Sequence, residues 1–449
     1  MMKKISVLIM SAFLLFGCGT EYFYSSFYLR NTDLKWMLSP SEQGSLNYKS
    51  TVLGTGDFRF NSPSIVATPD NYILFLYERR GNDYPDIIGV NGDSSKRADV
   101  YAAVSKNAEN FIYLTQLVGG SSLESHGSPI AFVNNKNNNS EVIVLAVGGN
   151  GFANSQDDTP SVISKSVSIP KTEYTEWTEW EDLNTNIFEP LLKDNFNRFY
   201  TSPDSGITLR NGTLACIIDY KKKDGNKAEG FAILYSTDNG TNWKIGAKTS
   251  YQNHRFAKII AERKDGKLLI AAAENSNYNK QANLAWFLAD SLDGSIASFK
   301  TDGLPLHNCG STAGGKIKLA EGGYSKEAII LLHSSPNRET INPNGVVNSV
   351  KNANALYISF NDGQNWEIVT NIFYPLKFNG NNYIYDDYDS KTSFRQSMRV
   401  LKDGTIAAVS ENGDREIASS GSYGYGFKLV YRRFSLNAIS DGKYRYEGL

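Results

Sequence analysis

The chain has 449 residues, of which 41% are hydrophobic and 12% are aromatic, so it can bury a large core and is not intrinsically disordered. Its 46 Lys and Arg residues nearly balance its 47 Asp and Glu residues, which argues against nucleic acid or an anionic membrane surface as the main partner. We therefore expect a folded protein that meets any charged ligand with local side chains.

The first predicted element is a lipoprotein-type signal peptide at residues 1–18. Lys3 and Lys4 precede an apolar run, 5–16, that is too short to span a bilayer as a helix. The run ends in Leu-Phe-Gly-Cys, which resembles a bacterial lipobox although its phenylalanine is unusually bulky; an ordinary cleaved signal is the alternative. We predict lipidation at Cys18 and a protein exported and lipid-anchored to a bacterial membrane or cell surface.

A polar lead-in or linker at 19–56 precedes the main domain, which we place at 57–449. This domain consists of short apolar runs separated by turn residues, and helical periodicity with capping signals is scarce, so the runs are predicted to be antiparallel strands. The clearest runs are 71–78, 141–149, 213–220, 231–237, 267–274, 327–335, 355–360, 405–412 and 428–436.

Two turn motifs recur between these runs. Asn or Asp, usually followed by Gly, indicates tight hairpins within 69–73, 210–214, 264–268 and 402–406. The second motif is Ser-x-Asp/Asn-x-Gly-x-x-Trp, which we interpret as a self-contained turn rather than a duplicated ligand site, because the turn itself uses its polar side chains. Its residues are Ser236, Asp238, Gly240 and Trp243 in one copy and Ser359, Asn361, Gly363 and Trp366 in the other. Radial repetition of such units predicts a β-propeller.

The second motif is the Asp box, and its setting resembles the sialidase (neuraminidase) family, whose fold is a six-bladed β-propeller. Residues 58–66 are similar to the family's Phe/Tyr-Arg-Ile-Pro opening, with two extra residues before the proline. Residues 205–207 resemble its Gly-x-Gly-Ile stretch, and 333–338 resemble its Ser-x-Pro…Arg segment. The resemblance covers about 57–434 and implies an all-β, six-bladed propeller of the sialidase type.

A site for sialic acid must hold a carboxylate while an oxocarbenium-like transition state develops, and arginine forks suit the carboxylate. The resemblance implies that Arg59, Arg79 or Arg80, and Arg338 bind the substrate. It implies Asp93 as the acid/base residue, with Asp83, Asp86 and Asp99 as rivals. A neutral tyrosine is the family's nucleophile, deprotonated by a glutamate.

Three positions depart from the family pattern. The segment 253–258, where the glutamate is expected, contains no carboxylate, and 273–275 lacks an expected clamp arginine. Arg395 stands where the register expects the nucleophilic tyrosine. Residues from other positions would then have to serve: Tyr388, with Tyr383 and Tyr385 as alternatives, and Glu274, with Glu262 as an alternative.

Two functions follow from this pattern. The first is a retaining exo-α-sialidase that removes terminal sialic acid from glycoconjugates, and the alternative is a non-catalytic propeller that binds glycans or a protein partner. Another glycosidase class would need two facing carboxylates, for which Asp93 and Glu274 are the candidates. Four histidines without metal-ligand spacing predict no metal and no cofactor. We expect a monomer that meets sialylated glycans or glycoproteins.

Overall fold

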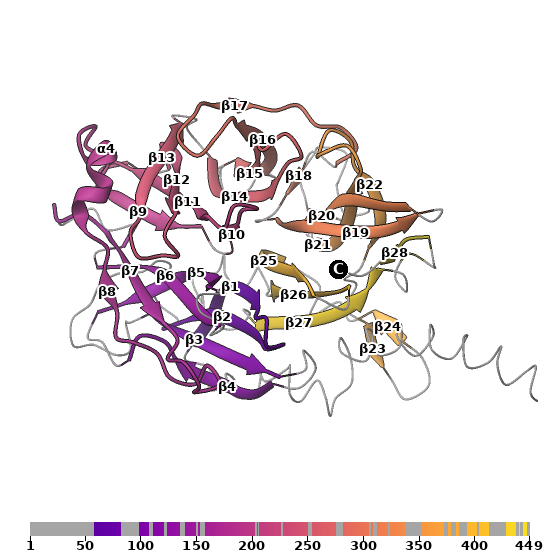
Figure 1. The fold of residues 1–449 in the computed structure, drawn as a ribbon, viewed down its shortest axis with the longest axis horizontal. Helices are drawn as coiled ribbons and strands as arrows, with labels where there is room; N and C mark the ends of the chain where they lie inside the picture. Colours follow the sequence, from indigo (N-terminus) through magenta and orange to yellow (C-terminus); the bar gives the residue numbers. More distant parts are fainter. Residues whose placement is uncertain are drawn as a thin grey trace, which may run out of the picture.

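The structure is a computed structural model that describes residues 58–81, 98–106, 111–120, 124–134, 140–149, 151–152, 158–202, 204, 206–225, 228–249, 254–274, 282–304, 307–308, 312–321, 324–336, 352–371, 376–378, 383–385, 393–401, 404–412, 428–436, 440 and 443–446. These residues form six antiparallel sheets of three to five strands around a central axis (Figure 1). The predicted all-β, six-bladed propeller is confirmed.

The sheets follow one another around the ring in sequence order, and we number them as blades. Blade 1 contains β1 (Phe58–Ala67), β2 (Ile73–Gly81), β3 (Ala98–Ser105) and β4 (Phe111–Leu117). Blade 2 contains β5 (His126–Asn134), β6 (Glu141–Gly148), β7 (Val162–Val167) and β8 (Glu181–Asp182). Blade 3 contains β9 (Arg198–Thr201), β10 (Ile207–Thr208), β11 (Leu214–Lys221), β12 (Gly230–Ser236) and β13 (Lys244–Thr249).

Blades 4 to 6 complete the ring. Blade 4 contains β14 (His254–Glu262), β15 (Leu268–Glu274), β16 (Ala282–Ala289), β17 (Ile296–Ser298) and β18 (His307–Asn308). Blade 5 contains β19 (Ala313–Glu321), β20 (Tyr324–Pro336), β21 (Asn352–Ser359), β22 (Glu367–Asn371) and β28 (Arg445–Tyr446). Blade 6 contains β25 (Ser393–Val400), β26 (Thr405–Asn412) and β27 (Lys428–Ser435). A separate hairpin, β23 (Leu376–Phe378) and β24 (Tyr383–Tyr385), and two short helices, η3 (Thr185–Phe188) and α4 (Glu189–Leu192), complete the described elements.

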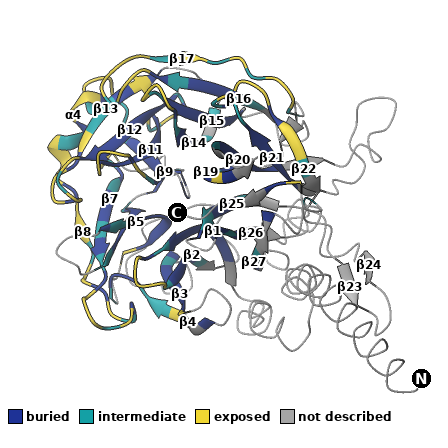
Figure 2. Ribbon diagram, turned by 45° about the vertical axis from the view of Figure 1, so that its right-hand side comes forward, coloured by how far each residue is buried: buried dark blue, intermediate teal, exposed yellow. Residues whose placement is uncertain are grey.

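The core consists of apolar clusters between neighbouring blades. Successive side chains of a strand point to opposite faces, so one strand serves two clusters. In β11, Leu214, Cys216 and Ile218 pack toward blade 2, whereas Ala215 and Ile217 pack toward blade 4. Within the described residues, each of the six junctions between successive blades has such a cluster. Figure 2 shows the result: the middle strands are buried and exposure is concentrated at the rim, around α4, β8 and β17.

The first strand of most blades, which lies nearest the axis (Figure 1), is interrupted by a bulge. The pairing shifts register between Asn61 and Ser64, Gly127 and Ile130, Arg255 and Lys258, and Ser393 and Gln396. In blade 3 the first strand is divided into β9 and β10, which both pair with β11. We call the residues at these interruptions, 62–63, 128–129, 202–206, 256–257 and 394–395, the bulge tier.

Bulges of successive blades lie side by side. Ser128 Oγ donates to Ser62 Oγ at 3.4 Å, and Thr201 Oγ1 donates to the Ser128 carbonyl at 2.6 Å. Because the bulge lies toward the beginning of each first strand, the bulge tier surrounds the axis toward one face of the ring. The turns between first and second strands lie at the other face, which we call the hairpin face.

Candidate functional site

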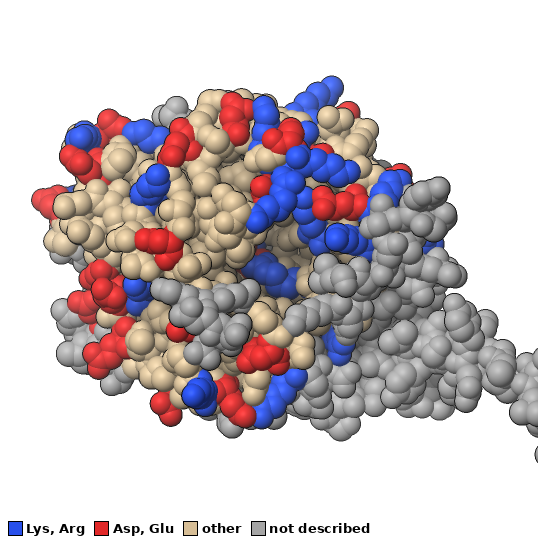
Figure 3. All heavy atoms as spheres, in the orientation of Figure 1, with Lys and Arg blue, Asp and Glu red and all other residues tan. Residues whose placement is uncertain are grey.

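The candidate site is the centre of the ring at the bulge tier. The molecular surface is hollowed where the blades meet, and Lys or Arg atoms lie inside this hollow (Figure 3). In the described part of the chain, Lys258, Arg395 and Arg399 are basic side chains of first strands that contact a blade not adjacent to their own. A basic centre is the electrostatic arrangement that attracts an anionic ligand.

Arg395 and Phe256 bring blades 6 and 4 together at the bulge tier. The Arg395 guanidinium carbon lies 4.9 Å from the centroid of the Phe256 ring, a cation–π contact. The Phe256 ring in turn lies 6.2 Å from the ring of Tyr200 on β9. The resemblance expects the nucleophilic tyrosine at position 395 and its glutamate within 253–258. The structure therefore brings these two segments together, but the side chains in contact are an arginine and a phenylalanine.

Two further polar side chains, Lys258 and Arg399, also join non-adjacent blades across the ring. Lys258, which is 1% exposed, donates from Nζ to the Gln396 carbonyl at 2.7 Å, joining blade 4 to blade 6. Arg399 of blade 6 lies 3.0 Å from Asp204 Oδ1 of blade 3 and donates to the Gly206 carbonyl at 3.2 Å. Blades 3 and 6 are opposite one another in a ring of six, so the Arg399 side chain spans the axis.

The structure places the arginines predicted in blade 1 on paired strands. Arg59 of β1 lies opposite Arg80 of β2, and the side chains of both are outside what the structure describes. Arg79 lies opposite Phe60 and Asp99, and its guanidinium carbon is 4.4 Å from the centroid of the Tyr101 ring. Positions 79 and 80 belong to opposite faces of the sheet, so the two arginines have different environments.

Several residues of the predicted site belong to the part of the chain that the structure does not describe. Asp93, Arg338, Tyr388 and Cys18 lie outside the described residues, as do the rival positions Asp83 and Asp86. Tyr383 and Tyr385 lie in β24, and their side chains are not described.

The two glutamates considered as the base lie at opposite ends of blade 4. Glu274 ends β15 and pairs with His254 at the beginning of β14, and its side chain is not described. Glu262 ends β14 at the hairpin face. It accepts the Arg210 backbone N–H at 2.8 Å and lies 3.1 Å from Arg210 Nε. Its contacts with the turn of blade 3 direct Glu262 away from the bulge tier, so it does not serve the candidate site.

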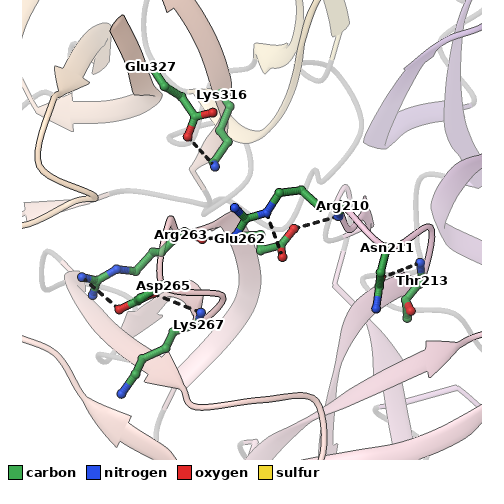
Figure 4. Close-up of polar contacts among 9 residues, drawn as sticks. All are labelled: Arg210, Asn211, Thr213, Glu262, Arg263, Asp265, Lys267, Lys316 and Glu327. Carbon is green, nitrogen blue, oxygen red and sulfur yellow. Dashed lines mark hydrogen bonds and ion pairs between the residues drawn. The ribbon is translucent and has the colours of Figure 1, made fainter.

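The hairpin face carries a group of charged side chains (Figure 4). The Arg210–Glu262 contact lies beside Arg263, whose carbonyl accepts from Arg210 Nη2. Two further ion pairs lie within blade 4, Arg263–Asp265 at 3.6 Å and Lys267–Asp290 at 2.7 Å. A third, Lys316–Glu327 at 2.6 Å, lies within blade 5. These opposite charges pair with one another on partly exposed turns and strands, so the group contributes modestly to stability and is not a candidate site.

The first Asp box also lies at the hairpin face, between β12 and β13. Ser236 Oγ accepts the Gly240 N–H at 2.8 Å and donates to Asp238 Oδ1 at 2.8 Å. Asp238 accepts the backbone N–H of Asn242 at 2.8 Å and its side-chain amide at 2.7 Å. These donors, the backbone N–H first, lower the pKa of the Asp238 carboxyl below its usual value. Trp243 is buried, and its Nε1–H donates to the Gly240 carbonyl at 3.1 Å.

The second box keeps most of this pattern with an asparagine. Ser359 Oγ accepts the Gly363 N–H at 2.9 Å and donates to Asn361 Oδ1 at 3.0 Å. Asn361 Oδ1 accepts the Asn365 N–H at 2.9 Å. Trp366 is buried and contacts the ring of Trp286 with centroids 5.6 Å apart. In both boxes the polar side chains are used inside the turn, which is a structural role.

Sequence reasoning did not single out Phe256, Lys258 or Asp204 as parts of the central site. One signal was present: three of the five Ser-Pro dipeptides, at 62–63, 128–129 and 202–203, lie at the interruption of a first strand, whereas that at 335–336 lies in β20 and that at 39–40 lies outside the described residues. Pro within a strand pattern indicates an edge or a bulge, so this repeat marks the bulge tier of blades 1 to 3. Blades 4 and 6 lack the dipeptide, and nothing comparable marks Phe256 or Arg395.

No group of three or more His, Cys, Asp or Glu side chains in the described part of the chain is placed to hold a metal ion. No helix among the described residues has both the length and the apolar character needed to cross a membrane.

Comparison with known proteins supports the fold. A family model described as a BNR repeat-like domain matches residues 67–280. No curated protein matches the chain. Among solved structures, a Hadza microbial sialidase superposes with a TM-score of 0.58 at 16% identity, over 85% of this chain and 66% of the other.

Two further structures agree. A Trypanosoma rangeli sialidase in complex with the inhibitor DANA has a TM-score of 0.59 at 14% identity, over 86% of this chain and 56% of its own. A leech intramolecular trans-sialidase has a TM-score of 0.56 at 13% identity, over 87% of this chain and 70% of its own. The chain spans less than two thirds of the length of the first two. It therefore has the β-propeller fold of the sialidases, with a BNR repeat-like region at residues 67–280.

Proposed function

We propose that this protein binds sialylated glycans at the centre of the ring, through the carboxylate of the terminal sugar, and does not cleave them by the tyrosine route. One observation carries this proposal: Arg395 stacks on Phe256 at 4.9 Å, where a tyrosine and a glutamate are expected. A guanidinium is the planar fork that matches a carboxylate, whereas neither arginine nor phenylalanine can act as the nucleophile or its base.

The surrounding residues favour an anionic ligand. Lys258 and Arg399 add positive charge within the same central region, where Arg399 forms an ion pair with Asp204. An ionised sugar carboxylate would meet a site that is already basic. Arg59, Arg79 or Arg80, and Arg338 are the further residues that we propose for its recognition. Bidentate contact to arginine is the geometry that such a carboxylate prefers.

The test uses the full-length protein with 3′-sialyllactose and with lactose as the matched neutral ligand, measured by isothermal titration calorimetry. A fluorogenic sialoside is incubated with the same preparation at acidic and neutral pH. We expect heat of binding with sialyllactose, none with lactose, and no release of the fluorophore. Equal binding of both sugars, or of neither, contradicts the proposal.

A second candidate function is a retaining exo-α-sialidase. It is favoured by the likeness in fold to solved sialidases, one of which is described as a covalent intermediate with 2,3-difluorosialic acid. In this case Asp93 is the acid/base residue, Tyr388 the nucleophile and Glu274 its base. Release of the fluorophore that is abolished in Tyr388→Phe and retained in Tyr385→Phe would establish this function and overturn the non-catalytic proposal.

The proposed partners require exposure to glycoconjugates outside the cytoplasm. We propose that Cys18 carries the lipid anchor and that the protein acts as a monomer at a membrane or cell surface. Metabolic labelling with a radioactive fatty acid tests the anchor: the wild-type chain is expected to take up label and Cys18→Ser is not. Equal labelling of both chains contradicts it.

A further inference from the structure

Phe256 has an unusual backbone conformation for its residue type. Its φ is 55°, in the left-handed region that glycine, asparagine and aspartate enter most readily. A bulky side chain persists there only when the surrounding structure holds it, and such positions concentrate at functional sites.

Asp219 makes the contact that holds the bulge of β14. Its Oδ2 accepts the backbone N–H of Phe256 at 2.9 Å, and the residue is 2% exposed. Asp219 lies on β11, the second strand of blade 3, so the bond joins one blade to the bulge of the next. A hydrogen bond from an amide to a buried carboxylate is stronger than one between neutral groups.

The same device occurs once more in the described residues. Glu78, on the second strand of blade 1 and 0% exposed, accepts the backbone N–H of Ser128 at 2.8 Å. Ser128 lies in the bulge of blade 2 with a φ of 52°. The two carboxylates thus make equivalent bonds, but the bulge that Glu78 holds carries a serine, whereas the bulge that Asp219 holds carries the ring under Arg395.

We propose that Asp219 is a positioning residue for the central site. Its carboxylate fixes the Phe256 amide, the amide fixes the ring, and the ring fixes the guanidinium of Arg395 in the orientation that receives a sugar carboxylate. That this orientation receives a sugar carboxylate rests on the proposed function, whereas the three positioning steps concern the protein alone.

The experiment compares Asp219→Ala with its matched control, Glu78→Ala, in the full-length protein. Two readouts are taken. The first is the NMR signal of the Arg395 Nε–H, which the Phe256 ring current displaces; Arg395→Lys assigns the signal and Phe256→Leu gives its undisplaced position. The second is the Kd for 3′-sialyllactose.

We expect Asp219→Ala to move the Arg395 signal to the position seen in Phe256→Leu and to raise the Kd about tenfold, since loss of orientation removes most of a bidentate contact. Glu78→Ala, which breaks an equivalent bond between blades 1 and 2, should leave both unchanged. Asp219→Asn keeps an acceptor but loses the charge, so the signal should move part of the way.

Different results overturn different statements. If the Arg395 signal stays in place in Asp219→Ala, or moves equally in Glu78→Ala, Asp219 does not position the pair. If the alanine variant fails to fold, Asp219→Asn decides, and an unmoved signal there rejects the role. If the wild-type protein does not bind sialyllactose, the proposed function fails, while the NMR comparison still decides the positioning role.

Discussion

Arg399 and Asp204 form an ion pair across the axis of the ring, between blades 6 and 3, with Nη2 3.0 Å from Oδ1. The two residues are far apart in sequence, and Asp204 is almost fully buried. The pair therefore couples opposite sides of the propeller rather than neighbouring blades.

The first prediction concerns this pair. Asp204→Ala should lower the free energy of unfolding by about 2–3 kcal/mol, because it leaves a partly buried guanidinium without its carboxylate. Denaturant unfolding followed by tryptophan fluorescence measures the change. The control is Asp158→Ala, which breaks the ion pair of an exposed carboxylate with Lys223 and should cost less than about 1 kcal/mol. Equal losses in the two variants would show that the ion pair across the axis contributes no more to the free energy of unfolding than an exposed ion pair.

The second prediction concerns pH and the Asp boxes. The pKa of Asp238 is lowered in the folded protein, mainly by the backbone N–H of Asn242. A lowered pKa means that this carboxylate stabilises the fold above its unfolded pKa of about 4, and that the contribution is lost as pH falls through the folded value. Asp238→Asn should therefore lose about 1 kcal/mol at neutral pH and almost none in strong acid, measured by urea unfolding across that range.

The second box supplies the reciprocal variant for this experiment. Asn361 makes the same main-chain contact without a charge. Asn361→Asp should therefore gain stability at neutral pH and acquire an acid-dependent loss that the wild-type box does not have. A pH dependence that is identical in wild type and both variants would exclude this role of the carboxylate.

The third prediction compares two glycines of blade 3. A Cβ at Gly246 would lie 2.1 Å from the backbone oxygen of Leu292, where β13 approaches a turn of blade 4. Gly212 has a φ of 85° and open space around its missing Cβ. Gly246→Ala should cost about 3 kcal/mol through overpacking, and Gly212→Ala about 1 kcal/mol through backbone strain alone. Thermal unfolding ranks the two, and the reverse order would contradict the close approach of the blades.

The fourth prediction tests the role of Arg395 in binding. Arg395→Lys keeps the charge but loses the planar fork, so the affinity for 3′-sialyllactose should fall about tenfold or more. Arg210→Lys makes the same chemical change at the hairpin face and should leave affinity unaltered. Titration calorimetry of both variants gives the comparison, and an equal effect would place the ligand elsewhere.

The nine strand segments predicted from the sequence are all strands in the structure, and each is the second or third strand of its blade. Most of their described side chains are buried, on both faces of the sheet, so most of these strands are apolar along their length and easy to recognise. The first strands contain bulges with Ser, Pro or Gly, such as 62–63 and 128–129, and these interrupt the apolar pattern. The same interruptions form the candidate site, so the pattern is weakest where the site lies.

The sequence alone determined the turns and the fold class, because an Asp box or an Asn-Gly hairpin is made by neighbouring residues whose geometry does not depend on the rest of the chain. Only the tertiary structure decided that Arg395 meets Phe256, that Asp219 holds the Phe256 amide, and that Glu262 belongs to the hairpin face. These contacts join different blades, and which residues of two blades meet depends on strand register and on bulges. A one-residue change in register reverses the face to which a side chain points, and apolar periodicity does not specify it at a bulge.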